Sequence, residues 1–358
     1  MIYYFFFFII SFLSIFNILK DNNRDWYYAT VPLASILILF AGLRFETGPD
    51  YGSYKAIFDI TGNEFKPDYG EPLFAILGYV IGLFTKNFNA LLFVVACTAV
   101  SLKFYFLKRY SKYLFVSLLL YYVTNYLSQD FGQIRQGLAI AICMIALHNL
   151  FLQNRKKFTF LVLLAAMFHF SAIIFLLALL VERINFTWQK MLVIWVACLV
   201  LSNALSFLSG YIMLLDVAGQ GRVIGDKLSY LTSEQYGNKI PINLGMFFKM
   251  AILIISKRFE VKYPSIIPKI GVFINLYFIG GCIFFLFSFV EIYAGRLSIY
   301  FLIFELVLIP YIISCCKETV FKILAFSLVW IYAAYLLYQQ FYVIKGTFLL
   351  PYQDIFNQ

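Results

Sequence analysis

Residues 3–19, YYFFFFIISFLSIFNIL, form an apolar run without a single charged side chain. A helix of about 20 mostly apolar residues is long enough to cross the hydrocarbon core of a bilayer. No basic segment precedes the run and no small-residue cleavage site follows it. We therefore expect a retained first span rather than a removed signal peptide.

Similar apolar runs recur along the whole chain. The 358 residues are 63% hydrophobic and only 13% charged, which excludes an ordinary soluble domain. The sequence predicts an all-α polytopic membrane protein, with residues 1–358 as one integral membrane domain. About ten full transmembrane helices are expected on length and composition. They cover residues 2–19, 27–43, 88–107, 112–128, 134–152, 188–209, 242–257, 268–290, 296–315 and 319–339.

Two further apolar segments do not fit this series. Residues 72–86 are too short for a comfortable crossing, and residues 158–181 carry His169 and Ser171 at their centre. We predict a short re-entrant or interfacial helix near 72–86. For 158–181 we predict a helical hairpin whose tip holds His169 and Ser171. Irregular backbone at membrane depth is tolerated only inside protein or beside a wet cavity, so both interruptions point to a site.

Basic residues predict which way the chain faces. Cytoplasmic loops of membrane proteins carry an excess of lysine and arginine. Three basic clusters are therefore placed in the cytoplasm: Lys103/Lys108/Arg109/Lys112, Arg155/Lys156/Lys157 and Lys257/Arg258/Lys262/Lys269. The segments predicted to face outward are 44–71, 129–135, 210–241, 291–296 and 340–358, and the outer loops 44–71 and 210–241 are expected to contribute to a site.

Charge and cysteine usage exclude several classes of partner. The net charge of +10 is concentrated in short breaks between apolar runs, which favours cytoplasmic loops over a nucleic-acid surface. All six cysteines fall in or beside apolar segments, without the spacing of a disulfide framework or a metal site. No nucleotide-binding glycine motif, no zinc motif and no D-x-D motif is present, so we expect no cofactor and no metal.

Four arginines lie on the predicted outer side: Arg44, Arg135, Arg222 and Arg296. A cation there resists both burial in lipid and the usual sorting of basic residues to the cytoplasm, so an anionic ligand is the simplest compensation. The guanidinium fork matches a diphosphate better than an ammonium group does. Structural alternatives exist: Arg44 at the membrane interface with its side chain reaching water, Arg135 paired with Asp130, and Arg222 simply solvated.

Other polar residues near these arginines suit sugars and proton transfer. Tyr51 and Tyr54 share one face of a predicted short helix, for which Asp50 is the expected N-cap, and Tyr300 shares a face with Arg296. These tyrosines are candidates for stacking on sugar rings. His169, Asp50 and Glu71 are candidate general bases. His169 is favoured because histidine side chains in general titrate near neutral pH.

Five short motifs follow one another along the chain: G-L-R-x-x-x-G-x-D-Y-x-x-Y over residues 42–54, Glu71-Pro72-Leu73-Phe74, Ile134-Arg135-Gln136, Phe168-His169-x-Ser171-Ala172 and Arg296-x-x-x-Tyr300. In this order they resemble EpsG-like members of the Wzy-type polysaccharide polymerases. One departure is Pro49, where the family more often has threonine. The resemblance extends from Gly42 to about residue 301.

The resemblance implies a metal-independent membrane glycosyltransferase that joins repeat units of O-antigen or exopolysaccharide on the periplasmic face of the bacterial inner membrane. The growing glycan would leave undecaprenyl diphosphate for the non-reducing end of a new lipid-linked repeat. The implied partners are this lipid-linked oligosaccharide and the bilayer, and a chain-length regulator is a further candidate. Arg44, Arg135, Arg296 and Arg222 would bind the diphosphate.

Two other functions are compatible with the same sequence features. An O-antigen ligase-like transferase would use the same donor and similar arginines. A non-enzymatic flippase of lipid-linked oligosaccharides would tend to show repeat symmetry and a charged path across the membrane, whereas here the unusual charges gather on one side.

Overall fold

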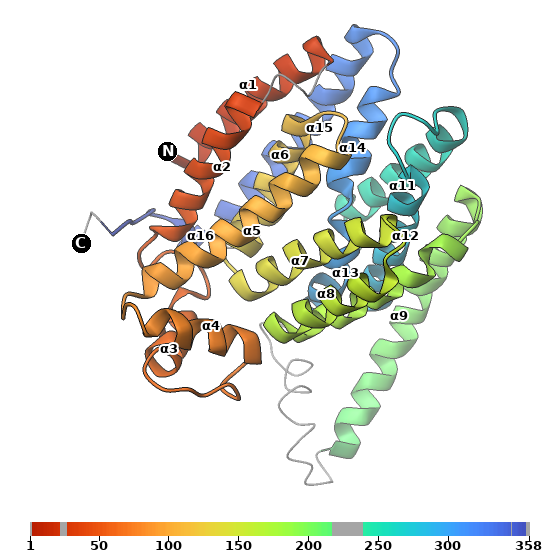
Figure 1. The fold of residues 1–358 in the computed structure, drawn as a ribbon. Coiled ribbons are helices and arrows are strands. Elements are labelled where there is room, and N and C mark those ends of the chain that lie inside the picture. Colours follow the sequence, from red (N-terminus) through yellow and green to blue (C-terminus); the bar gives the residue numbers. More distant parts are fainter. Residues whose placement is uncertain (1, 22–26, 217–238, 345, 356–358) are drawn as a thin grey trace. The chain divides into compact units, whose positions relative to one another are not determined.

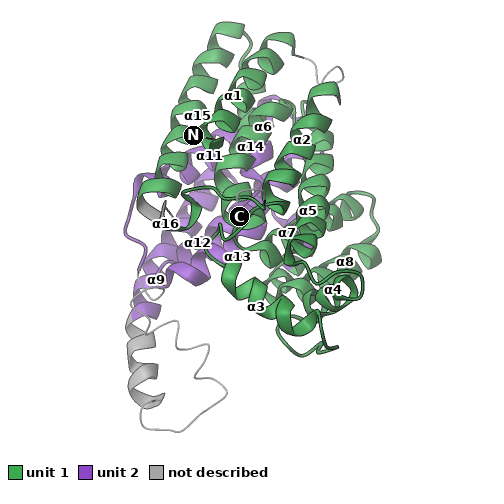
Figure 2. Ribbon diagram, turned by 90° about the vertical axis from the view of Figure 1, so that its left-hand side faces the viewer, with its two compact units in different colours: residues 1–176, 266–268, 309–358 green, residues 177–265, 269–308 purple. Residues whose placement is uncertain are grey.

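A computed structural model describes residues 2–21, 27–216, 239–344 and 346–355. These ranges are helical and contain no strand, only an isolated β-bridge between Arg44 and Asp354, which confirms the predicted all-α class. The chain separates into two compact units (Figure 2). Unit 1 comprises residues 1–176, 266–268 and 309–358, and unit 2 comprises residues 177–265 and 269–308. The single domain expected from the sequence stays a prediction.

Unit 1 contains most of the elements. In chain order they are α1 (Ile2–Lys20), α2 (Tyr27–Gly42), α3 (Tyr51–Thr61), α4 (Pro72–Gly82), α5 (Phe88–Tyr110), α6 (Leu114–Tyr121), the π-helix η2 (Tyr122–Asp130), α7 (Ile134–Phe151), α8 (Arg155–Phe168), α15 (Thr319–Gln339), the π-helical turn η4 (Gln340–Ile344) and α16 (Gly346–Leu349) (Figure 1). Unit 2 contains α9 (Trp188–Asp216), α11 (Leu244–Lys262), α12 (Ile270–Leu286) and α13 (Glu291–Leu302). The boundaries between the units fall within the 3₁₀-helix η3 (Phe170–Arg183) and α14 (Glu305–Ser314).

Five helices in the described ranges are long and apolar enough to cross a membrane: Ile2–Lys20, Phe88–Tyr110, Ile134–Phe151, Trp188–Ser206 and Thr319–Tyr342. A sixth results if α13 and α14, bent by 50°, form one span. The other spans expected among the predicted ten are shorter or interrupted or, in the case of α11, more highly charged. For example, α2 contains Pro32, and π-helical geometry breaks residues 114–130 into two pieces.

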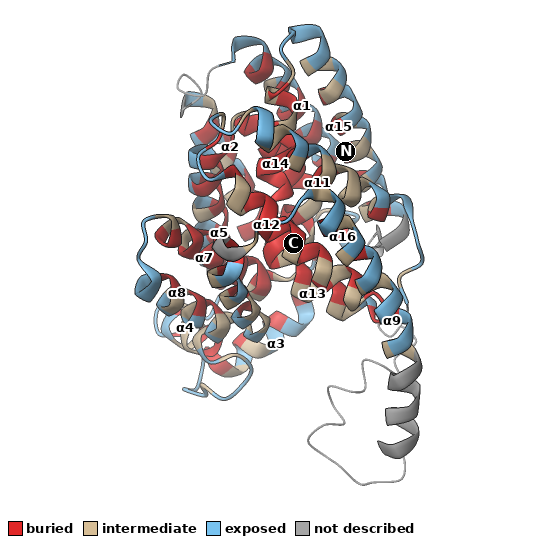
Figure 3. Ribbon diagram, turned by 90° about the vertical axis from the view of Figure 1, so that its right-hand side faces the viewer, coloured by how far each residue is buried: buried red, intermediate tan, exposed pale blue. Residues whose placement is uncertain are grey.

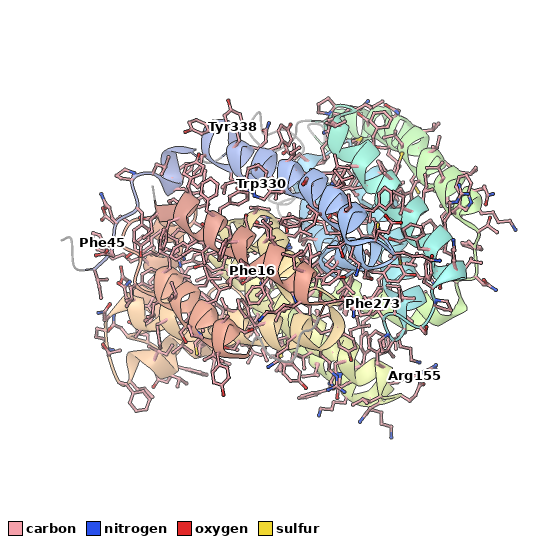
Figure 4. The ribbon with its side chains drawn as sticks, turned by 90° about the horizontal axis from the view of Figure 1, so that it is seen from above. Phe16, Phe45, Arg155, Phe273, Trp330 and Tyr338 are labelled. Carbon is pink, nitrogen blue, oxygen red and sulfur yellow. The ribbon has the colours of Figure 1, made fainter. Side chains whose placement is uncertain are left out.

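The surface of α15 shows that it faces lipid. Its exposed large apolar residues recur at helical spacing: Phe321, Leu324, Leu328, Ile331, Tyr335 and Tyr338. Trp330, on the side toward α1, donates a hydrogen bond from its indole nitrogen to Ser11 Oγ at 3.0 Å (Figure 4). An apolar stripe of this kind, exposed in Figure 3, matches a hydrocarbon environment and not water. The chain is a polytopic membrane protein.

The chain reverses direction at His169, as predicted. Helix α8 ends at Phe168, His169 has extended backbone (φ −156°, ψ 113°), and η3 begins at Phe170. The rings of Phe158 and Phe175 lie 6.0 Å apart, centroid to centroid. A chain continuing straight through His169 would separate them by more than about 20 Å, given the rise of a helix. Residues 158–175 therefore form a hairpin with His169 at its tip.

The linkers of unit 1 gather at two ends. At the site end, residues 42–51, 131–135 and 348–355 meet, for example through the hydrogen bond from Phe45 N to Gln353 O at 2.9 Å. At the basic end, Asp21 lies 3.4 Å from both Lys112 and Lys322. Most of the lysine and arginine in the linkers lies at the basic end: Lys20, Lys108, Arg109, Lys112, Arg155, Lys156, Lys157, Lys317 and Lys322.

Helices α3 and α4 form a closely packed pair at the site end, and α4 has the short length predicted for 72–86 (Figure 1). The contact depends on glycine. A Cβ at Gly82 would lie 2.0 Å from the carbonyl oxygen of Gly62, whereas a Cβ at Gly52 would meet nothing within 4 Å. Since α4 begins directly after Glu71, this packing also sets the position of that carboxylate.

We predict that Gly82→Ala destabilises the protein by about 1–3 kcal/mol, because the added methyl group meets backbone that cannot move aside cheaply. Gly52→Ala is the matched control and should leave stability unchanged. The measurement is the thermal unfolding midpoint of each purified variant in detergent. Equal midpoints for the two variants would show that α3 and α4 do not pack as described.

Candidate active site

Glu71 lies between two of the other predicted site residues. Its Oε1 is 2.9 Å from His169 Nδ1, and its Oε2 accepts a hydrogen bond from Arg135 Nη1. The three residues are far apart in the sequence, and all belong to unit 1. The structure therefore brings a candidate base, a carboxylate and a predicted phosphate-binding arginine into one cluster, called here the Glu71 cluster.

Each member of the Glu71 cluster lies where helical structure starts or stops. Glu71 precedes α4, whose first residue is Pro72, and Gly70 supplies a turn with φ of +95°. Arg135 is the second residue of α7, and His169 occupies the break between α8 and η3. Because the three residues lie at helix ends, their side chains can meet in the space between the helices.

Electrostatics fixes the ionisation of Glu71. The side chains of Glu71 and His169 are each 17% exposed. Burial alone would raise the pKa of Glu71, but the hydrogen bond with His169 and the charge of Arg135 outweigh it, so the pKa lies below its usual range. Glu71 is thus a carboxylate at neutral pH and can only accept. His169 Nδ1 must donate, and in the tautomer with hydrogen on Nδ1 the other ring nitrogen, Nε2, is the acceptor.

Besides its ion pair with Glu71, Arg135 packs against two aromatic rings. Its guanidinium carbon lies 5.2 Å from the ring centre of Tyr54 and 5.8 Å from that of Phe74. Its Nε is buried and has no hydrogen-bond partner among the described residues. The alternative that Arg135 pairs with Asp130 is wrong, because Asp130 is bonded elsewhere.

Asp130 instead forms a buried ion pair that the sequence analysis missed. Lys103 Nζ lies 2.6 and 2.8 Å from the two Asp130 oxygens, and Tyr121 donates a hydrogen bond to Asp130 at 2.5 Å. Placing Lys103 in a basic loop was therefore wrong. It lies inside α5 and is 0% exposed. The available signal was its position within the apolar run 88–107, where an isolated lysine needs a partner.

The Lys103–Asp130 pair also touches the helix that carries Arg135. A Cβ added to Gly137 would lie 2.7 Å from Asp130 Oδ1, so Asp130 packs against the start of α7. We predict that Lys103→Met, which leaves Asp130 charged and buried, costs about 3–5 kcal/mol. Lys103→Met combined with Asp130→Asn should cost less. Lys108→Met, at an exposed position of the same helix, is the control for thermal unfolding midpoints, and an equal effect of the two single lysine variants would contradict the role of the pair.

Arg44 is buried rather than reaching water. It is 1% exposed, donates from Nε to Thr47 O at 3.1 Å, and lies 4.8 Å from the ring centre of Phe131. Among the described residues it forms no ion pair with a carboxylate. Burial lowers the pKa of Arg44 to about 10, against the opposing effect of nearby tyrosines. Arg44 is therefore a buried cation at neutral pH.

The end of the chain covers Arg44. Gly48 N donates to Phe348 O at 2.7 Å, and Ile355 N donates to Leu43 O at 3.1 Å. No sequence pattern indicates that residues 348–355 bond to residues 43–48, so this contact could not be predicted. Tyr54 contacts the Glu71 cluster, since its ring centre lies 5.2 Å from the guanidinium carbon of Arg135, and it is one of the tyrosines near Arg44.

The remaining predicted residues lie as follows. Tyr51 and Tyr54 are only 6% and 3% exposed, so in this conformation they pack within the protein and do not form an open stacking surface. Asp50 occupies the position before α3, as predicted, without a side-chain cap hydrogen bond. Arg296 and Tyr300 belong to α13 of unit 2, where Tyr300 is buried. Arg222 lies outside the described residues.

Comparison with known proteins agrees with the motif order. The family model described as the EpsG family matches residues 26–353. The chain is also 24% identical over 339 residues to the amylovoran biosynthesis protein AmsC of Erwinia amylovora, covering 90% of this chain and 88% of that protein. No solved structure is a significant match. The chain belongs to the EpsG family.

Proposed function

We propose that this protein polymerises lipid-linked oligosaccharide repeat units on the periplasmic face of the bacterial inner membrane. It transfers the growing glycan from undecaprenyl diphosphate to the non-reducing end of a new lipid-linked repeat. Family membership and the similarity to an amylovoran biosynthesis protein support a polysaccharide polymerase. The observation that carries the proposal is the Glu71 cluster, in which His169, the proposed base, and Arg135 both contact Glu71.

The chemistry needs one proton acceptor and one stabilised leaving group. The acceptor hydroxyl oxygen attacks the anomeric carbon, its proton passes to His169 Nε2, and the bond from that carbon to the diphosphate oxygen breaks. Glu71, bonded to Nδ1 at 2.9 Å, orients the ring and stabilises the imidazolium that forms. The departing diphosphate leaves with the polyprenyl lipid.

Arg135 supplies positive charge where the leaving group develops its negative charge. It is only 25% exposed, so water screens its field weakly. Arg44 is a second buried cation that we assign to the diphosphate. Arg296 and Arg222 stay candidates for the same task, Tyr51 and Tyr300 for shaping the sugar site, and Asp50 for an alternative base.

The distribution of charge supports the proposed periplasmic placement. The basic end of unit 1 would face the cytoplasm, and the site end, with the Glu71 cluster, would face the periplasm. Lipid-linked repeats that have already crossed the membrane would then reach the cluster from the outer leaflet.

The test is deletion of the gene followed by sizing of the surface polysaccharide and of the lipid-linked intermediates. A polymerase predicts loss of long chains and accumulation of single repeats on the lipid carrier. Accumulation of long chains on the carrier would instead indicate a ligase, and repeats confined to the cytoplasmic leaflet would indicate a flippase.

A further inference from the structure

Unit 2 contains a second candidate site, separate from the Glu71 cluster. A cavity of about 630 Å³ lies between the linker before α9 and the end of α11. Its polar lining includes Lys257, Arg258 and Glu260, and its aromatic lining includes Phe186 and Trp188. This volume is in the range of small-molecule sites.

The cavity favours an anion with a planar or phosphate-like group. The guanidinium of Arg258 lies 6.0 Å from the ring centre of Trp188 and has no ion pair among the described residues. Lys257 is partly neutralised, since its Nζ lies 2.7 Å from Glu260. Arg258 is thus the cation with free hydrogen-bonding capacity, and its fork suits phosphate oxygens.

An apolar groove continues from this cavity along α9. A second cavity of about 320 Å³ shares Phe186 and Gln189 with the first and extends to Val193 and Ile194. Helix α9 is one of the candidate spans, and only 17% of its apolar window is buried. Val193 is 67% exposed. The groove therefore opens toward the hydrocarbon of the bilayer, with Lys190 at its polar edge.

We propose that the cavity binds the headgroup of an anionic phospholipid, with one acyl chain in the groove along α9. The charged pocket and the adjoining apolar groove match the two parts of such a lipid. An acidic peptide would leave the groove unused. The basic segment Lys257–Lys269 belongs to the predicted cytoplasmic side, where anionic headgroups attract basic residues.

The test titrates the purified protein in detergent with phosphatidylglycerol or phosphatidylcholine and follows the thermal midpoint and the bound lipid by native mass spectrometry. We expect phosphatidylglycerol to bind and stabilise, and phosphatidylcholine to do so weakly. Arg258→Ala should weaken phosphatidylglycerol binding by at least about tenfold, the value of one charged hydrogen bond. Val193→Trp should also weaken binding without changing charge, because it fills the groove.

Lys262→Ala is the matched control. It removes a positive charge from the same helix but from outside the cavity, so affinity should stay within about twofold if the cavity, and not the general surface field, binds the lipid. Equal losses in Arg258→Ala and Lys262→Ala, or equal binding of the two lipids, would overturn the proposal. So would inorganic phosphate stabilising lipid-free protein as well as phosphatidylglycerol does. If Arg258→Ala does not fold, Arg258→Gln replaces it, and wild-type affinity in that variant would likewise refute the site.

Discussion

Replacing His169 with alanine is expected to reduce polymerisation by about 10²–10⁴-fold, the usual contribution of a general base. The reason is that His169 alone in the Glu71 cluster offers a neutral nitrogen, Nε2, while Nδ1 is committed to Glu71. Cells carrying the variant should accumulate single lipid-linked repeats at normal protein level. The purified variant should still bind the lipid-linked donor, because the arginines are unchanged.

His148 provides a matched control, since the chain has only two histidines. It lies near the other end of α7, with Nδ1 2.6 Å from the Tyr110 hydroxyl. His148→Ala should leave chain length unchanged. If His169→Ala also retained full chain length, the base role would pass to Asp50 and the mechanism proposed for the Glu71 cluster would be wrong.

Changes to Arg135 should have the second-largest effect. Arg135→Lys keeps the positive charge but removes the planar fork, so one nitrogen can no longer serve both Glu71 and a phosphate oxygen in fixed geometry. We expect a rate loss of about 10²–10³-fold, comparable with the loss of one preorganised donor to a developing anion. Donor binding should weaken much less than turnover.

Arg155→Lys is the control for this second prediction. Arg155 is exposed at the start of α8 and points outward in Figure 4. Its replacement should leave the rate unchanged. A normal rate in Arg135→Lys would show that a diffuse positive charge suffices and that the fork geometry has no part in stabilising the leaving group.

The low pKa of Glu71 bears on how both predictions are measured. Because its folded-state pKa lies below the usual value, the contribution of Glu71 to stability is present above that usual value and is lost as pH falls through the folded-state pKa. In the wild-type protein Glu71 therefore stays ionised between about pH 6 and 8. Because His169 and Arg135 are the groups that lower the pKa of Glu71, the variants at these positions are compared with the wild type across this whole pH range.

Much of the fold followed from local signals. The long apolar runs predicted the spanning helices because a helix that crosses the bilayer is apolar along most of its length. The break at His169 was predictable for a related reason, since a polar pair within an apolar run conflicts with an unbroken span. The short helix from Tyr51 and the short α4 were visible in turn residues and length.

The partners within the site were not predictable, because they depend on packing between distant segments. Glu71 was one of three candidate bases, and only the approach of α4 to α8 shows that it contacts His169. Lys103 was assigned by counting charges along the chain, which cannot reveal a buried partner such as Asp130. The spacing of Tyr51 and Tyr54 predicted an exposed aromatic surface on one face of a helix. In the structure Phe88 packs against Tyr51 and Phe74 packs against Tyr54, and both come from later segments of the chain.

The most direct measurement reconstitutes the purified protein in liposomes with a chemically defined undecaprenyl-diphosphate-linked repeat and follows both products. The mechanism predicts that chains lengthen and that one undecaprenyl diphosphate is released for every glycosidic bond formed. Chains that fail to lengthen, or that lengthen without release of the lipid diphosphate, would contradict it.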